Sequence, residues 1–399
     1  MLILINIFGE DRPGLTSEMT VLLSEFDAAI LDVGQAVIHN HLSLGLLVSL
    51  PVGLDSLKKA ISNLGIVAKF TPIDSDSYEN WVGMQGRNRQ ILTLLARRID
   101  ATHLAVVCKV IETYGLSIDN ITRLSGRVPL SDDNGADNTT TKACIEFSLR
   151  GEVNKSFREA LLKVCSNQDI DIAVQEDNVF RRHRRLIAFD MDSTLIKTEV
   201  IDQLAKLVGS ASEVAAITEQ AMHGRLDFRE SLKRRVSLLA GLPEEKMRLI
   251  ASRLPLTEGA KNLVSSVKKL GYKTAILSGG FMYFGKVLQN TLGIDYVFAN
   301  ELEIINGQLT GHVREPIVDS EKKAELLRML AKKENISLQQ VVAVGDGAND
   351  LEMLQAAGLG IAFHAKPFLR ENAKQSISTL GLDSILYLMG IRDRDTLSP

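Results

Sequence analysis

Carboxylate side chains follow two short apolar runs that lie far apart in the sequence. Asp190 and Asp192 come after Leu186–Phe189, and Asp346 follows Val341–Val344 with one glycine between them. Phosphate monoesters hydrolyse very slowly unaided, so a site that cleaves them must supply a nucleophile and cancel the repulsion between anions. Carboxylates can bind Mg²⁺ and, once that repulsion is cancelled, attack phosphorus. The pattern predicts a magnesium-dependent site in which Asp190 becomes an aspartyl-phosphate.

The same chemistry gives roles to the neighbouring polar residues. Asp190 and Asp346 would share the Mg²⁺ ion, with the main-chain carbonyl of Asp192 as a further ligand. The carboxylate of Asp192 would protonate the leaving alkoxide and later deprotonate the attacking water. Asn349 and Asp350 would position the waters of the metal and a phosphate-binding lysine.

A second group of residues could hold the phosphate. Ser278 and the N–H of Gly279 follow the apolar run Thr274–Leu277. A helix that began at Gly280 would help them to hold an anion. Lys323 is the best placed cation in chain order. Each residue alone is more often structural, and a lysine on a helix is usually exposed, so it is the ordered set that favours a site.

Regular elements must bring these residues together. From residue 184 on, short apolar runs alternate with segments of helical spacing. Such runs are typical of a parallel sheet that is covered by helices on both faces, and ligands bind at the carboxyl ends of its strands. The predicted strands are Leu186–Phe189, Thr274–Leu277, Tyr296–Ala299, Val341–Val344 and Gly360–Phe363.

Residues 184–392 resemble the haloacid dehalogenase superfamily, and within it the phosphoserine phosphatases. The resemblance is carried, in order, by Asp190–Thr194, Ser278–Gly280, Lys323 and Gly345–Asp350. It implies a Rossmann-like α/β fold with Asp190 as nucleophile and Asp192 as acid and base. It also implies Mg²⁺ ligands from Asp190, Asp192 and Asp346, and a phosphate held by Ser278, Gly279 and Lys323.

Helical segments between the first two motifs would form a cap over the site, at about residues 198–256. A cap excludes water and reads the leaving group. The predicted helices are Val200–Val208, Glu213–His223, Phe228–Leu239 and Glu244–Leu254.

Two charged residues of the cap could recognise an amino acid. Arg235 has helical spacing with Phe228 and Leu232, so it lies on an apolar face where a guanidinium needs an anionic partner. It would bind a carboxylate, or else extend its charge to the edge of the face. Glu199 could bind an ammonium group, or be an exposed carboxylate at a helix start.

The resemblance narrows the substrate. It implies that Glu199 binds the amine and Arg235 the carboxylate of O-phospho-L-serine, with Met222 and Phe228 shielding the site. The product would be L-serine, in the last step of its biosynthesis. O-phosphohomoserine, a non-catalytic amino-acid sensor and phosphoryl transfer to an acceptor other than water remain alternatives. The predicted substrate-binding set is Glu199, Met222, Phe228, Arg235, Ser278, Gly279, Lys323 and Asn349.

The N-terminal half predicts two β-α-β-β-α-β modules, the ferredoxin-like plan, at residues 1–80 and 85–178. Asp11–Gly14 resembles the ligand-binding turn of ACT domains, which implies an amino-acid effector such as L-serine and a homodimer. The equivalent turn of the second module, Arg98–His103, lacks that pattern, so a structural or dimerising role is the alternative to ligand binding there. A flexible hairpin loop is expected at Ser131–Asn138.

The composition excludes several classes of protein. A net charge of −3 gives no sign of a nucleic-acid partner, and no apolar stretch is long enough to cross a membrane. Cys108, Cys144 and Cys165 have no paired spacing, so buried free thiols and a cytoplasmic location are expected. Arg181–Arg185 is interpreted as a solvated lead-in to the first strand of the parallel sheet.

Overall fold

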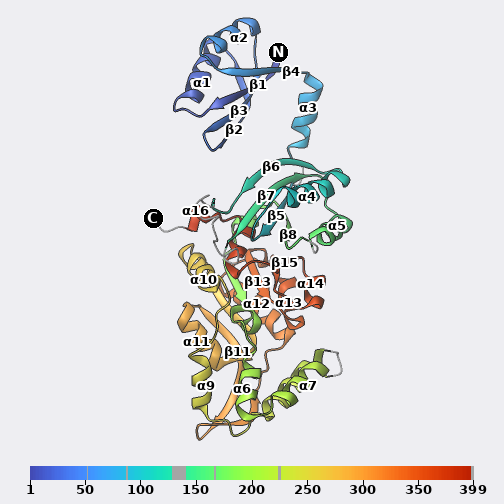
Figure 1. Cartoon of the computed structure of the whole chain (residues 1–399), viewed down its shortest axis with the longest axis vertical. Helices are drawn as coiled ribbons and strands as arrows, with labels where there is room; N and C mark the ends of the chain where they lie inside the picture. The colour runs from blue at the N-terminus through green and yellow to red at the C-terminus, as the bar shows by residue number, and fades with distance from the viewer. Residues whose placement is uncertain (52, 87–88, 128–140, 166–167, 223–225, 397–399) are drawn as a thin grey trace. The chain divides into compact units, whose positions relative to one another are not determined.

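Figure 1 shows the computed structural model of the chain, which describes residues 1–51, 53–86, 89–127, 141–165, 168–222 and 226–396. The chain divides into two compact units, Met1–Arg87 and Asn88–Pro399. The loop expected at Ser131–Asn138 lies outside the described residues. Within the described ranges, no helix is long and apolar enough to cross a membrane.

The first unit is a four-stranded antiparallel sheet in the order β2-β3-β1-β4. Alternate residues of β1, including Ile3 and Ile5, are buried in a core with Met19 and Leu23 of α1. A helix that the sequence did not predict, α3, begins after Asp74, whose carboxylate accepts the N–H of Ser77 at 2.7 Å. The elements are β1 (Leu2–Glu10), α1 (Leu15–Glu25), β2 (Ala29–Ile38), β3 (His41–Ser49), α2 (Leu54–Asn63), β4 (Val67–Ile73) and α3 (Ser75–Met84).

The second unit begins with a module of the same topology, in the order β6-β7-β5-β8. The predicted ferredoxin-like plan is therefore confirmed in both halves of the N-terminal region. The elements are β5 (Arg89–Ala96), α4 (Ala101–Thr113), β6 (Ser117–Arg123), β7 (Ala143–Arg150), α5 (Lys155–Cys165) and β8 (Asp171–Glu176).

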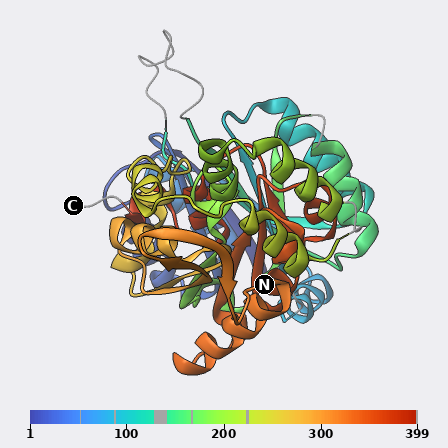
Figure 2. The same cartoon turned by 90° about the horizontal axis from the view of Figure 1, so that it is seen from below.

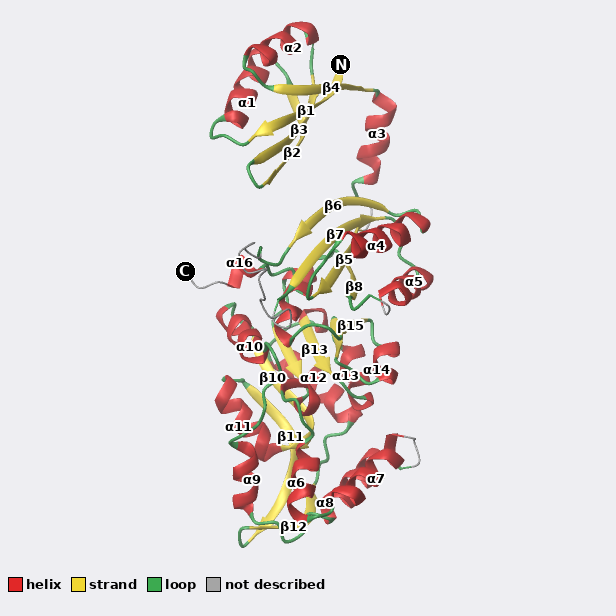
Figure 3. Cartoon of the chain, in the orientation of Figure 1, coloured by secondary structure: helices red, strands yellow, loops and turns green. Residues whose placement is uncertain are grey.

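A seven-stranded sheet follows, in the order β12-β11-β10-β9-β13-β14-β15 (Figure 3). Its strands are parallel except for β12, which pairs antiparallel with β11. The predicted parallel sheet is confirmed, and the edge strands β12 and β15 are additions to it. The strands are β9 (Leu186–Phe189), β10 (Lys273–Phe281), β11 (Tyr296–Ile305), β12 (Gln308–Arg314), β13 (Val341–Gly345), β14 (Leu359–Phe363) and β15 (Gln375–Ile377).

Successive side chains of a strand point to opposite faces of the sheet. Because the side chains on both faces are apolar, helices cover both of them. On one face, Phe189 shares a core with Phe284 of α11. On the other, Ala188 shares a separate core with Leu327 of α12. The helices outside the cap are α10 (Ala260–Lys269), α11 (Met282–Leu292), α12 (Ser320–Lys333), α13 (Leu351–Ala356), α14 (Pro367–Asn372), α15 (Ile385–Leu388) and α16 (Asp393–Thr396). The last of them, α16, contacts the second module, because the N–H of Asp393 donates to the carbonyl of Leu124 at 3.2 Å.

The cap is inserted between β9 and β10, as the sequence predicts. Figure 2, which is turned by 90° about the horizontal axis and seen from below, brings these green-to-yellow helices to the front. Part of the cap also joins the β11–β12 hairpin, since the N–H of Gly241 donates to the carbonyl of Leu309 at 2.8 Å. The helices are α6 (Val200–Val208), α7 (Ala211–Met222), α8 (Phe228–Ser237) and α9 (Glu244–Ala251).

The interpretation of Arg181–Arg185 as a solvated segment is wrong for two of its residues. Arg181 is 1% exposed and pairs with Glu146 of β7, and Arg184 is 4% exposed. Burial lowers the pKa of Arg184 to about 10. The second module packs against this segment, which a local run of charges could not reveal. Cys144 and Cys165 are buried free thiols as expected, while Cys108 is only partly buried.

Candidate active site

The strands that carry the three catalytic motifs are neighbours at the centre of the sheet. Phe189 of β9 pairs with Ile276 of β10 on one side and with Val344 of β13 on the other. The residues that follow these positions therefore emerge together at the carboxyl edge. Asp190 is tied to β13 directly, because its N–H donates to the carbonyl of Val344 at 2.9 Å.

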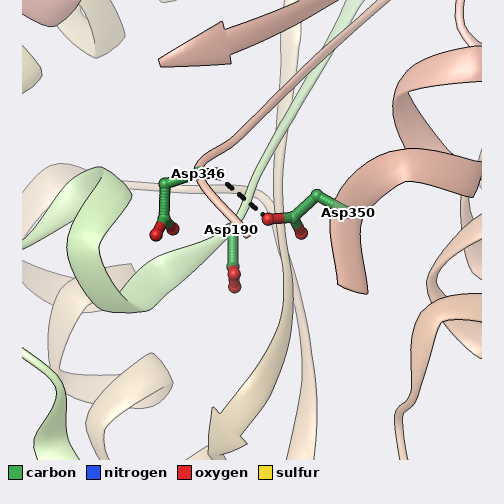
Figure 4. Close-up of side chains that lie close together, drawn as sticks. All are labelled: Asp190, Asp346 and Asp350. Carbon is green, nitrogen blue, oxygen red and sulfur yellow. Dashed lines mark hydrogen bonds between the residues drawn. The ribbon is translucent and has the colours of Figure 1, made fainter. Parts of the chain in front are cut away.

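Three buried carboxylates meet at this edge, from Asp190, Asp346 and Asp350 (Figure 4). One oxygen atom of each lies within 4.8 Å of the others. Asp350 has both oxygens engaged, with Oδ1 bound to Lys323 and Oδ2 accepting the N–H groups of Asp346 at 3.1 Å and Gly347 at 3.0 Å. Asp350 thus supports the loop that follows β13.

Lys323 is fully buried against two of these carboxylates. Its Nζ lies 3.0 Å from Asp190 Oδ2 and 2.7 Å from Asp350 Oδ1. Burial lowers the pKa of its ammonium group, but the attraction of Asp190 and Asp350 outweighs that effect, so the pKa is raised. The lysine therefore stays charged and lies beside the carboxylate of Asp190.

The cluster still carries an excess of negative charge. Burial, and then repulsion from Asp350 and Asp190, raises the pKa of Asp346 to about 8. Burial, and then repulsion from Glu199 and Asp190, also raises the pKa of Asp192. These shifts show carboxylates that lack sufficient counter-charge, so a hard cation with oxygen ligands fits this site.

A tight turn places Asp192 beyond the end of β9. Its Oδ1 accepts the N–H of Val200, the first residue of α6, at 3.1 Å. Ser193, the next residue, has a positive φ of 57°. The Oγ of Ser193 donates to Glu199 Oε1 at 2.9 Å. The turn thus links the residues predicted to move protons and to bind an amine.

The Ser278–Gly280 segment lies beside this turn. Ser278 is buried, and its Oγ accepts the N–H of Gly280 at 3.0 Å. The carbonyl of Gly279 accepts a hydrogen bond from Asn300 Nδ2 at 2.8 Å. The helix expected to begin at Gly280 begins at Met282 instead, because Phe281 resumes pairing with Asn300 of β11 after a bulge.

The cap reaches the phosphate-binding segment through Phe228. A Cβ atom on Gly279 would lie 2.9 Å from Cζ of Phe228 and 3.6 Å from Nδ2 of Asn349. Phe228, Gly279 and Asn349 therefore meet at one point. The next cap residue, Arg229, pairs with Asp319 at the start of α12 at 2.6 Å.

Arg235 is partly buried within the cap. Its Nε donates to the carbonyl of Ser231 at 3.3 Å, and its Nη1 lies 3.5 Å from Thr218 Oγ1. Burial lowers its pKa, and the attraction of Glu199 opposes that change. Among the described residues it forms no ion pair. Met222 ends α7, and residues 223–225 and the Met222 side chain lie outside what the structure describes.

Three residues of this site were not predicted from the sequence. Thr194 is fully buried, and its Oγ1 donates to Asp346 Oδ1 at 3.1 Å. Asn300 supports Gly279, as described above. Lys366 Nζ lies 3.8 Å from Asp346 Oδ2 and 3.9 Å from Glu199 Oε1. Lys366 follows β14, so the rule about strand ends could have found it, whereas nothing local marks Asn300.

Two protein-family models match this chain. The model described as haloacid dehalogenase-like hydrolase matches residues 184–358, and an ACT domain model matches residues 1–70. The parallel sheet with its inserted cap and the carboxylates at its centre thus define a haloacid dehalogenase-like hydrolase.

Curated relatives identify the family more closely. A phosphoserine phosphatase of Mycobacterium tuberculosis is 38% identical over 396 residues, which cover 98% of this chain and 93% of that protein. A phosphoserine phosphatase of Archaeoglobus fulgidus is 51% identical over 234 residues, which are 58% of this chain and 68% of the relative. The chain belongs to the phosphoserine phosphatase family.

Solved structures agree with this assignment. A HAD family hydrolase from Salmonella enterica serovar Typhi aligns with a TM-score of 0.65 and 32% identity, covering 75% of this chain and 98% of that one. A probable phosphoserine phosphatase from Vibrio cholerae aligns with a TM-score of 0.57 and 32% identity, covering 75% and 86%.

Proposed function

We propose that this protein hydrolyses O-phospho-L-serine to L-serine and phosphate through an aspartyl-phosphate on Asp190. The observation that carries the proposal is the contact between Lys323 Nζ and Asp190 Oδ2 at 3.0 Å. A buried cation beside a carboxylate at a strand end suits a nucleophile that must approach an anionic phosphate. The names of the relatives support the choice of substrate.

Asp192 is proposed to move the protons. It would protonate the leaving serine oxygen and then take a proton from the water that hydrolyses the aspartyl-phosphate. Its Oδ1 is held by the N–H of Val200, which fixes the carboxyl group between the sheet edge and the cap. Phosphate oxygens would be held by Ser278, the N–H of Gly279 and Lys323.

The proposed metal is Mg²⁺, bound by the carboxylates of Asp190 and Asp346 and the carbonyl of Asp192. When bound, it would supply positive charge that offsets the repulsion between the nucleophile and the phosphate. Asp350 is proposed to orient Lys323 and the loop after β13, because both of its oxygens already accept hydrogen bonds.

Recognition of serine is assigned to the cap. Arg235 would bind the carboxylate and Glu199 the amine, while Phe228 and Met222 exclude water. Asn349 would contact the substrate where it meets Phe228 and Gly279. O-phosphohomoserine is the alternative substrate, because one extra methylene changes binding by only about 1–3 kcal/mol.

The decisive experiment is a turnover panel in the presence of Mg²⁺. Phosphoserine, phosphothreonine, phosphohomoserine and phosphoethanolamine are compared by kcat/KM, with Asp190→Asn as the inactive control. We expect phosphoserine to be preferred and Asp190→Asn to release no phosphate. Equal rates across the panel would reject the roles of Glu199 and Arg235. Phosphate release by Asp190→Asn would reject the nucleophile.

The N-terminal region is proposed to regulate the enzyme and to form a homodimer. Gly14, with φ of 92°, precedes α1 without a side-chain cap. The N–H of Leu15 donates to the carbonyl of Arg12 at 3.4 Å, so the N–H groups of Thr16 and Ser17 are the ones proposed to bind the carboxylate of L-serine. Calorimetry with L-serine tests the binding, and absence of heat at millimolar concentration would reject it.

We also propose the domain bounds 1–80, 85–178 and 184–392. A cytoplasmic location is proposed as well, and the three free thiols support it.

A further inference from the structure

Two segments connect the cap to the sheet, and they pair with each other. The first connection is residues 195–197, and the second is residues 255–257. Ile196 and Leu256 form an antiparallel bridge. The N–H of Lys197 donates to the carbonyl of Pro255, and the N–H of Thr257 donates to the carbonyl of Leu195, each at 2.9 Å. Because the first connection lies between the proposed acid–base residue and the proposed amine-binding residue, the position of the second connection influences both.

The second connection is held by a residue outside the phosphatase domain. Glu258, directly after that connection, forms a bidentate ion pair with Arg97 of the second ferredoxin-like module, with N–O distances of 2.8 and 2.7 Å. Bidentate guanidinium–carboxylate pairs fix orientation as well as distance. Arg97 is itself anchored, because its carbonyl accepts a hydrogen bond from Thr141 Oγ1 at 3.0 Å.

The backbone at Glu258 has a second anchor. Its carbonyl accepts the N–H of Leu382 at 2.8 Å. A Cβ atom on Gly259 would lie 2.4 Å from Asp383 Oδ1, so the chain runs close against that loop. Asp383 also pairs with Lys142 of the second module. The second module and the segment that follows β15 thus hold the end of the connection jointly.

The same module is docked firmly at a second place. Asp171 Oδ2 accepts three hydrogen bonds from Ser378 and Thr379, at 2.7 to 2.8 Å. Gln375 exchanges hydrogen bonds with the backbone of Val174, as a neighbouring strand would. The module therefore provides a rigid base for Arg97.

The equivalent turn of the first module also carries an arginine, but this arginine has a different kind of partner. Arg12, between β1 and α1, pairs with Glu18 of its own helix at 2.5 Å. Arg97, between β5 and α4, instead pairs across a domain boundary. Arg97 thus links the second module to the phosphatase domain, whereas Arg12 is engaged within its own module.

We infer that Arg97 is a positioning residue for the reaction, which acts through Glu258 to hold the second connection and so to orient the cap. The inference rests on the proposed function for its kinetic test, but its structural test does not need activity. On this inference, the second module is part of the structure that positions the cap.

The test uses the full-length chain with Arg97→Gln, Glu258→Gln and the double variant. We expect each single change to lower kcat/KM for phosphoserine about tenfold, because small displacements far from the reacting atoms reduce rates strongly. The double variant should lose no more than either single variant, since both remove the same contact. Turnover of p-nitrophenyl phosphate, whose leaving group lacks the amine and carboxylate, should change less.

Hydrogen exchange provides the readout that is independent of activity. The amides of Lys197 and Thr257 should exchange faster in both single variants. Arg150→Gln, which removes an arginine paired with Asp119 inside the same module, is the matched control and should leave these amides unchanged. Thermal unfolding checks that each variant is folded. If one single variant does not fold, the other still provides the exchange measurement.

The outcomes separate the two proposals. Unchanged exchange at Lys197 and Thr257, or additive losses in the double variant, overturns the inference whatever the substrate. A wild-type enzyme that leaves phosphoserine intact overturns the proposed function, while the exchange result still decides the role of Arg97.

Discussion

A Cβ atom on Gly280 would lie 2.4 Å from Asp192 Oδ2, a distance that no side chain tolerates. The same Cβ would lie 2.6 Å from Cε of Met191 and 3.2 Å from Ser278 Oγ. The glycine therefore makes room for the proposed acid–base residue to lie directly against the phosphate-binding segment. This contact ties two motifs that are far apart in the sequence into one geometry.

Gly280→Ala should separate these motifs. We expect kcat for phosphoserine to fall about a hundredfold, because displacement of a catalytic group by a fraction of an ångström to one ångström has that order of effect. Gly83→Ala is the control, since its Cβ would meet nothing within 4 Å. Steady-state kinetics measure the effect, and wild-type kcat in Gly280→Ala would contradict the assigned position of Asp192.

Lys323→Met should reduce both activity and stability. The change leaves Asp190 and Asp350 buried without their shared cation, and breaking a buried pair in this way costs about 3–5 kcal/mol. Urea unfolding in metal-free buffer measures that loss. Lys322→Met is the control, because Lys322 is partly exposed and pairs with Glu325 on the same helix. Equal unfolding midpoints for the two variants would refute the prediction.

Metal-free protein should become less stable as the pH rises. The folded-state pKa of Asp346 is about 8, above its ordinary value, so the folded state retains a proton that the unfolded state has lost. The stabilisation by that proton is complete below the unfolded pKa and is lost as the pH passes through about 8. Unfolding free energies measured in chelator between about pH 5 and pH 9 should therefore decline.

Two comparisons identify the source of that decline. Asp346→Asn should make the decline shallower, because an amide does not titrate, while Asp192, whose pKa is also raised, still contributes. Saturating Mg²⁺ should raise the melting temperature of the wild type and not that of Asp346→Asn, since a ligand that binds only the folded state stabilises it. Equal stabilisation of both proteins by Mg²⁺ would place the metal elsewhere.

The sequence could predict the parallel sheet and the residues at its edge for a simple physical reason. Uninterrupted apolar strands must be covered on both faces, and the residues after neighbouring strands then converge, as Asp190, Ser278 and Asp346 do. Burial of charged side chains was harder to predict. Lys323 and Arg181 are buried because carboxylates from distant segments neutralise them, and no local pattern contains those partners.

The cap charges should control substrate choice more than the rate of phosphate chemistry. Arg235→Gln should raise KM for phosphoserine strongly, because the substrate carboxylate would lose a charge-assisted partner worth about 1.5–3 kcal/mol. Phosphoethanolamine lacks that carboxylate, so its kcat/KM should change little. Arg234→Gln is the matched control, because Arg234 is exposed and pairs with Glu230 on its own helix. Equal losses for phosphoserine and phosphoethanolamine in Arg235→Gln would show that this arginine supports the cap rather than the substrate.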